Sequence, residues 1–456
     1  MKRTRQFFSV LLTLAMLLSL VPATALAASP DADVALYNNA GKLISLSNKQ
    51  YLATNGDTEA STGYNGTQGY VARYEASTGT LFLKDYHGVG KDGGILTVGD
   101  LNIVVKSDSS FTTSITSSTN TLMGIQSGKG KLDISGDGTL TVSANGNSDV
   151  YGIFAKEGVT ISAPLDVTVK LNDSTTKRPL YGIYTNSGAI SLSGGDKTIA
   201  VTGGGSAVYG VYNNAFTPEI TDNGNINISG KLTVNLNNGR SNVGIHTGSG
   251  GTITLDGATV NIPSNFHFGI YNNNGNVVIT NKSDVTLTSA KEGGEGIYAK
   301  YGGDLIIENS TVKVSMKGYA ADLENGKMSI KDSTVDLTLD NEAYRVVETS
   351  GSATNTIDLS TSGSVTLTAS GKQTSAMIAG KVTATSGTKL EKGTHYPGLE
   401  TYDGEYDAAG GKTVLQFVHE SAAPTPSATV GDVTIDGTTG TAIADKEVII
   451  TLANDT

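Results

Sequence analysis

The 456-residue chain has no cysteine and no tryptophan, and only 9 of its residues are prolines. Without cysteine it can form neither a disulfide framework nor a thiolate metal site. The 57 glycines, in contrast, suit a fold that contains many tight turns. Since no disulfide can stabilise such a chain, its length and its 38% apolar content must supply a long hydrophobic core.

Positive charge and long apolar runs are also scarce. Lys and Arg number 32 against 43 Asp and Glu, and the one long apolar run, residues 7–21, follows Lys2, Arg3 and Arg5. With the small-residue pattern Ala25-Leu26-Ala27 after it, this segment is typical of a signal peptide, residues 1–27. Its removal takes the net charge from −11 to −14 and leaves no membrane span. An acidic exported chain is not expected to bind nucleic acid, and a polyanionic ligand would require a local basic patch.

A short phrase of Gly, Ile or Val, and an aromatic residue recurs along the chain. It stands at Gly152, Gly182, Gly210, Gly269 and Gly296, with Gly244-Ile245-His246 as a variant. The glycines are 25 to 34 residues apart, a period that is typical of a solenoid.

Two further segments in each repeat alternate apolar and polar residues, for example 276–280 and 284–289. Such alternation predicts half-buried strands, and no segment between 90 and 420 has a helical period. We therefore predict an all-β, right-handed parallel β-helix with three short strands per coil and roughly ten coils. A row of sandwich domains or a propeller would need a longer period. The predicted inward residues include Ile253, Leu255, Val260, Ile262, Val277, Ile279, Val285, Leu287, Leu305, Ile307, Val312, Val314 and Met316.

The predicted organisation has five parts. After the signal peptide come a lead-in and cap at 28–94, the β-helix at 95–419, a Pro/Ser/Ala linker at 420–429, and the incomplete start of a further β module at 430–456. A cap is expected because an open solenoid end would expose strand edges.

The leader, the lead-in "GTLFLKDYHG…GGILTVGDLNIVVKSDSS" and the Gly-Ile-Tyr coils resemble the large β-helix surface proteins of Gram-positive bacteria. The resemblance covers roughly residues 70–420, and the C-terminal start is similar to an immunoglobulin-like surface repeat. Some of those proteins are described as carbohydrate-binding or adhesin-like. The resemblance thus implies a secreted protein displayed at the bacterial cell surface.

Catalytic and metal sites are not indicated. Arginines and histidines are few and scattered, and no stretch combines His with Asp or Glu at ligand spacing. Asp304, Asp322, Asp332 and Asp336 lie in consecutive repeats, but solvated outward positions explain them better than a catalytic cluster. Turns such as 135–139 combine Asp and Gly without completing a calcium loop. We expect no enzyme activity, no cofactor and no metal; a pectin-type lyase or hydrolase remains an alternative.

The repeated phrase contains the candidate binding residues. If the Ile and Val residues fill the core, the residue after each must face outward, in a file made of Phe154, Tyr184, Tyr212, His246, Tyr271 and Tyr298. A second aromatic file, Tyr151, Tyr181, Tyr209 and Phe268, shares the parity of the isoleucines and is expected in corner or core packing.

Two interpretations of the outward file stay open. The rings could simply stack between coils and stiffen the sheet. Alternatively, the rings, with amides such as Asn214 and Asn273 beside them, could bind an extended polysaccharide or host glycan, since sugar C–H faces pack on aromatic rings. The corresponding predictions are a purely structural stalk and a non-enzymatic, adhesin-like glycan-binding protein.

Overall fold

The computed structural model describes most of the chain between residues 34 and 350. The described segments are 34–116, 120–173, 177–204, 207–215, 224–248, 250–263, 265–339 and 347–350, with separate strands between 356 and 440. Side chains are described as far as Val347. All regular structure in these segments is β, so they contain no helix that could cross a membrane.

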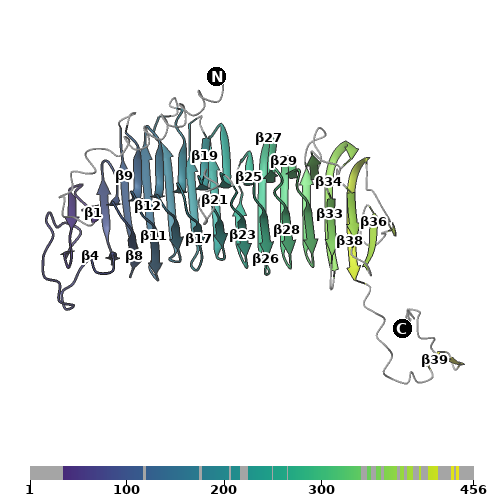
Figure 1. The fold of residues 1–456 in the computed structure, drawn as a ribbon, viewed down its shortest axis with the longest axis horizontal. Helices are drawn as coiled ribbons and strands as arrows, with labels where there is room; N and C mark the ends of the chain where they lie inside the picture. The colour runs from purple at the N-terminus through teal and green to yellow at the C-terminus, as the bar shows by residue number, and fades with distance from the viewer. Residues whose placement is uncertain are drawn as a thin grey trace, which may run out of the picture.

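The described chain is a parallel β-helix, a rod of stacked coils in which each coil contributes three strands (Figure 1). Eight turns lie between Leu122 and Leu339, and strands at both ends continue the stack. The predicted fold class is confirmed.

Equivalent strands of successive coils form three parallel columns. The first column contains β10 (Leu122–Ser127), β13 (Val150–Ala155), β16 (Leu180–Thr185), β19 (Ala207–Asn213), β22 (Ser241–Thr247), β25 (Phe268–Asn273) and the second halves of β27 (Asp284–Lys300) and β29 (Thr311–Glu324). The second contains β11 (Leu132–Gly136), β14 (Val159–Ile161), β17 (Ile190–Leu192), β20 (Ile226–Ile228), β23 (Ile253–Asp256), β26 (Val277–Thr280), β28 (Leu305–Glu308) and β30 (Met328–Lys331). The third contains β12 (Leu140–Gly146), β15 (Leu165–Leu171), β18 (Lys197–Thr202), β21 (Lys231–Asn237), β24 (Thr259–Ile262), the first halves of β27 and β29, and β31 (Thr334–Leu339).

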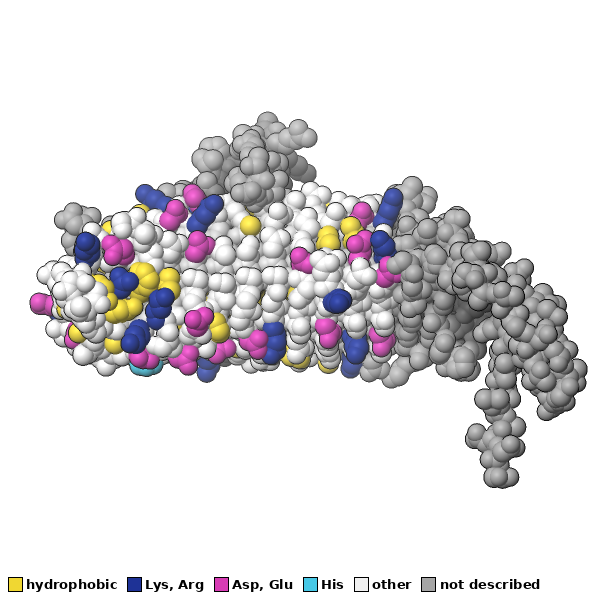
Figure 2. Space-filling view, turned by 90° about the horizontal axis from the view of Figure 1, so that it is seen from below, with side chains coloured by type: hydrophobic (Ala, Val, Ile, Leu, Met, Phe, Trp, Pro, Cys, Tyr) yellow, Lys and Arg dark blue, Asp and Glu magenta, His cyan; other side chains and the backbone are white. Residues whose placement is uncertain are grey.

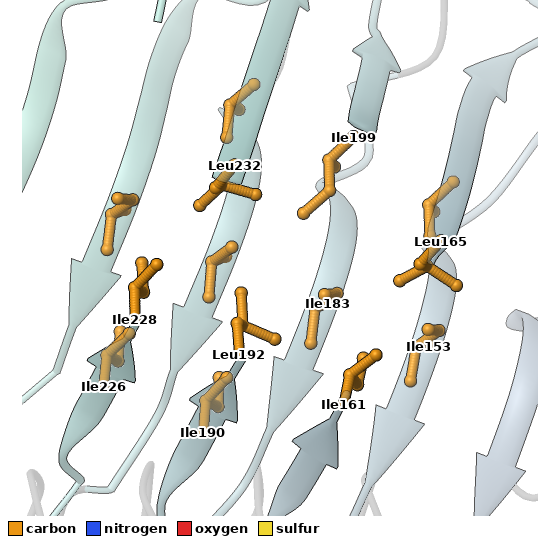
Figure 3. Close-up of a cluster of buried hydrophobic side chains, with 14 of the residues drawn as sticks. Ile153, Ile161, Leu165, Ile183, Ile190, Leu192, Ile199, Ile226, Ile228 and Leu232 are labelled. Carbon is orange, nitrogen blue, oxygen red and sulfur yellow. The ribbon is translucent and has the colours of Figure 1, made fainter. Parts of the chain in front are cut away.

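One apolar core runs through the described coils. Because side chains alternate along a strand, most Ile, Leu and Val residues of the strands face inward, where they meet equivalents from the other columns. Figure 3 shows this for Ile183, Ile190 and Ile199, which come from three different strands. Each such side chain is fully buried and contributes about 1.5–3 kcal/mol. All thirteen inward residues named above are buried, as predicted.

The glycine of the repeated phrase is required by close packing between coils. A Cβ added at Gly269 would lie 2.6 Å from the carbonyl oxygen of Gly296 in the next coil and 3.1 Å from Leu287 Cδ1. The same conflict recurs at the equivalent glycine of every coil from Gly124 to Gly296. At the following coil Ala320 takes this position, which accounts for the loss of the phrase after residue 318.

The N-terminal end is built differently from the coils. β1 (Val34–Tyr37) pairs antiparallel with β2 (Leu43–Leu46), and β3 (Tyr51–Leu52), β4 (Ala72–Glu75) and β5 (Thr80–Leu83) form an antiparallel meander. Parallel pairing begins where β5 meets β8 (Leu101–Val105) and β6 (His87–Gly90) meets β9 (Ser109–Ser114). β7 (Ile95–Thr97) pairs parallel with β10, the first strand of the first column.

Parallel pairing also gives way at the other end. The columns are continued by β32 (Val347–Ser350), β33 (Thr356–Ser360), β35 (Lys381–Ala384) and β34 (Ser364–Ala376), which pairs parallel with β31. On its other side β34 pairs antiparallel with β38 (Ala409–His419). β36 (Thr388–Gly393) is also antiparallel to β38, and β37 (Glu400–Thr401) is antiparallel to β36. β39 (Val433–Ile435) and β40 (Thr438–Gly440) form a hairpin inside the predicted additional module. The predicted signal peptide and the linker at 420–429 lie outside the described residues.

Candidate functional site

The predicted outward file exists as one continuous stack, here named the aromatic ladder. Strand register pairs its members coil by coil, in the order Phe154, Tyr184, Tyr212, His246, Tyr271 and Tyr298. Centroids of successive rings are 4.4 to 5.5 Å apart. The repeated phrase therefore places one ring on each of six successive coils.

The second aromatic file lies beside the ladder and outside the main core, so the expected core packing is wrong. Tyr151 packs edge-on against Phe154 at 5.6 Å and against Tyr184 at 5.1 Å, and Tyr151 and Tyr184 belong to a cluster separate from the main core. The cause is a local break in alternation, because both Gly152 and Ile153 point toward the core. Residues on either side of this pair consequently share the outer face.

The aromatic spacing could have revealed this arrangement. Tyr-Gly-Ile-Tyr at 181–184 and 209–212 (with Val211) separates two aromatic residues by three positions, where period-two alternation would place them on opposite faces. A bulge-like irregularity brings both to one face.

Stacking hides most of the ring surface. Tyr184, Tyr212 and His246 are only 3%, 8% and 9% exposed, whereas Phe154, Tyr271 and Tyr298 are half-buried. Most neighbours within the ladder are nearly parallel, with interplanar angles of 5° to 20°; Tyr184 and Tyr212 are tilted by 60°. Since coils stack along the rod, the parallel rings turn their faces toward one another and leave mainly edges to a ligand.

Hydroxyl groups and amides meet along the ladder. Tyr212 Oη donates to Asn214 Oδ1 at 2.7 Å, and Tyr184 Oη donates to Asn186 Oδ1 at 3.3 Å. Asn214 Nδ2 in turn lies 3.5 Å from Asn186 Oδ1. Burial raises the pKa of both tyrosines well above 10, so they remain neutral donors.

The other asparagines of the phrase shape the corner. Asn272 is buried and donates to the carbonyl oxygens of Gly251 and Asn276, and Asn274 has a left-handed backbone with φ of 79°. The predicted site residue Asn273 donates from Nδ2 to Gly248 O at 2.7 Å. Among the predicted amides, only Asn214 is bonded to a ladder side chain.

His246 is the unusual member of the ladder. Its ring is sandwiched between Tyr212 at 4.6 Å and Tyr271 at 4.4 Å, and neither ring nitrogen has a hydrogen-bond partner. Burial lowers the pKa of His246 to about 3, so the imidazole is neutral at physiological pH.

The ladder ends at carboxylates. Asp322 occupies the next ladder position after Tyr298, and Tyr298 Oη donates to Glu324 Oε2 at 3.2 Å. Glu295 stands beside them in the second file, where burial and the nearby Asp322 raise its pKa to about 8.

The aspartates of consecutive repeats occupy different parts of the coil. Asp304 precedes β28 and accepts the backbone N–H of Lys327, whereas Asp322 lies in the first column. Asp336 lies in β31 opposite Lys313, and Asp332 follows β30 in a left-handed turn. In the described part of the chain, no group of three or more His, Asp or Glu residues could hold a metal ion.

No protein-family model, curated protein or solved structure matches this chain.

Proposed function

We propose that the protein is a non-enzymatic β-helix rod, exported and displayed at the bacterial cell surface, that binds an extended polysaccharide or host glycan along the aromatic ladder. The observation that carries the proposal is the unbroken row of six rings on successive coils. Five strand spacings separate the first ring from the last, which corresponds to about 24 Å. A row of this length suits a linear polymer better than a single small molecule.

Edges and hydroxyl groups, not ring faces, would make the contacts. The half-buried Tyr271 and Tyr298 and the hydroxyl–amide pair of Tyr212 and Asn214 offer donors and acceptors in a regular line. Sugar hydroxyl groups can form hydrogen bonds with Tyr hydroxyl and Asn amide groups, and each such bond contributes about 0.5–1.5 kcal/mol. The predicted leader and the resemblance to Gram-positive surface proteins support the proposed location.

A structural stalk is the second candidate, and the burial of the ladder favours it. Tyr184 and Tyr212 use most of their surface to pack on neighbouring rings. Such packing stabilises the rod without any ligand.

Removing hydroxyl groups while keeping the rings tests the two candidates. In the double variant Tyr271→Phe and Tyr298→Phe the stack persists, but the hydroxyl groups of two half-buried rings are lost. If the ladder binds glycan, affinity measured on a glycan array and by calorimetry should fall about tenfold. Thr160→Val is the matched control because it removes an exposed hydroxyl group from β14, on another column.

Three outcomes would contradict the proposed function. A double variant with unchanged affinity would exclude the ladder as the binding surface. If the unmodified protein bound no glycan, the stalk would be favoured, and release of new reducing ends from a polysaccharide would contradict the non-enzymatic proposal.

A further inference from the structure

A second aromatic group lies on the N-terminal cap, outside the ladder. It consists of Tyr51, Tyr64, Tyr70, Arg73 and Phe82 and is here named the cap cluster. Arg73 in β4 stands directly between Tyr51 in β3 and Phe82 in β5, since antiparallel register pairs it with both. Tyr64 and Tyr70 come from the segment that joins β3 to β4. Short-range pairing and one long connection thus assemble three rings around one guanidinium group.

The guanidinium group of Arg73 lies among aromatic rings. Its Cζ lies 3.8 Å from the ring centroid of Phe82, 4.7 Å from that of Tyr64 and 5.4 Å from that of Tyr70. Nε is buried without a hydrogen-bond partner, and Nη1 forms an ion pair with Glu75 Oε2 at 3.7 Å, a distance beyond hydrogen-bond range. The side chain is still 19% exposed. The guanidinium group is therefore partly accessible, and its one ion pair is a long one.

Further positive charge lies next to the cap cluster. Lys84 and Lys106 are exposed and directly follow the paired residues Leu83 and Val105, and Lys106 Nζ lies 6.0 Å from the Phe82 ring. Figure 2 shows hydrophobic side chains gathered at one end of the rod with Lys and Arg among them, while the middle of this face carries few charges. In a chain with net charge −11, Arg73, Lys84 and Lys106 bring three positive charges together here, with Glu75 and Asp85 beside them.

We propose that the cap cluster binds a carboxylate-bearing polysaccharide, with Arg73 holding a sugar carboxylate and the neighbouring rings packing against the sugar. This inference rests on the proposed glycan-binding function and names the ligand class. Arginine matches a planar carboxylate through two parallel hydrogen bonds, and Lys84 and Lys106 can pair with the next carboxylates of a polymer. The rings are available because Tyr51, Tyr64 and Tyr70 meet edge to face, at 64° and 88°, and are not stacked in parallel.

The test uses the full chain and one matched pair of probes. Oligogalacturonate carries a carboxylate on each sugar, and its methyl ester has the same sugars without the charges. The unmodified protein should bind the acid form at least tenfold more tightly than the ester in calorimetry. Arg73→Gln should remove this preference, whereas Arg240→Gln, which removes an exposed arginine between β21 and β22, should retain it.

A second variant decides the question if Arg73→Gln fails to fold. The double variant Lys84→Gln and Lys106→Gln changes only exposed side chains and should weaken binding of the acid form several-fold. This loss of affinity should be larger at low salt, where charges are less screened. Polyglutamate serves as the peptide probe, and tighter binding of polyglutamate than of oligogalacturonate would overturn the glycan assignment.

The failures of the two proposals differ. Binding of other glycans without a preference for the acid form, or an unchanged preference in a folded Arg73→Gln variant, would overturn this inference alone. If no glycan were bound at all, the proposed function would fail together with it.

Discussion

The aromatic ladder and the cap cluster use the same residue types in opposite ways. In the ladder, His246 and Tyr271 are stacked 4.4 Å apart at 5°, so each ring covers the face of the next. In the cap cluster, Tyr64 and Tyr70 meet at 88°, and a guanidinium group occupies the space between rings. Parallel register produces the first arrangement, because it places identical positions of each coil one above another. The antiparallel meander has no such repeat.

The difference shows that aromatic content alone does not indicate a binding surface. A ring whose two faces are covered contributes mainly to stability, whereas a half-buried ring beside an unsatisfied donor can still take up a ligand. Substitutions in the ladder should therefore lower mainly the stability of the fold. Substitutions in the cap cluster should lower mainly ligand affinity.

The largest effect is expected where the ladder depends on its backbone. In Gly210→Ala, the new Cβ would lie 2.3 Å from Val234 Cγ1 and 2.6 Å from the carbonyl oxygen of Gly244. Neither the core nor the next coil can move far, so the free energy of unfolding should fall by about 3 kcal/mol. Chemical denaturation followed by circular dichroism measures this change.

The matched control is Gly99→Ala, next to the cap, where no atom lies within 4 Å of the added Cβ. Its effect should stay within about 0.5 kcal/mol. If both variants lost the same free energy of unfolding, the effect would come from replacing any glycine and not from the close approach of the coils.

Truncating one ring in each region should give two effects that differ from each other, neither of them larger than that of Gly210→Ala. Tyr184→Ala removes a ring that is 3% exposed and contacts Phe154, Tyr181 and Tyr212, and should lower the free energy of unfolding by about 3 kcal/mol. Phe82→Ala removes a half-buried ring and should lower it by about 1–2 kcal/mol. The same denaturation measurement applies, and a larger loss for Phe82→Ala would reverse the assignment of structural and binding roles.

The core of the rod was predictable because its rule is local. Val285 and Leu287 alternate with polar residues, and period-two alternation is enough to place both inside. The glycine of the phrase was visible as a repeat, but the reason for it, the carbonyl oxygen of the next coil, lies in contacts between residues 25 to 34 positions apart.

The candidate site was predictable only in part, because some of its features depend on local irregularities and on contacts between residues far apart in the sequence. The ladder follows from the position after each isoleucine, whereas the second file depends on Gly152 and Ile153 both pointing inward, which alternation excludes. In the cap cluster, Tyr64 and Tyr70 lie in a segment without strand periodicity, so nothing near them in sequence indicates Arg73 as their partner.

The smallest predicted effect concerns the pH dependence of the ladder. The pKa of His246 is about 3 in the folded protein and about 6.5 when unfolded, so between pH 6.5 and pH 3 mainly the unfolded chain takes up the proton. Stability contributed by the neutral imidazole is therefore present above pH 6.5 and is lost as the pH falls toward 3. His246→Phe keeps a ring between Tyr212 and Tyr271 but cannot be protonated, and it should be about 1 kcal/mol less sensitive to a shift from pH 7.5 to pH 5.5.

Denaturation curves at both pH values measure this difference, and Tyr271→Phe is the control because it changes a neighbouring ladder ring without adding or removing a group that titrates in this range. The control should shift both curves equally. Parallel pH curves for the unmodified protein and His246→Phe would mean that the imidazole accepts a proton in the folded state. The ladder would then be open to water at its centre, and the contrast with the cap cluster would disappear.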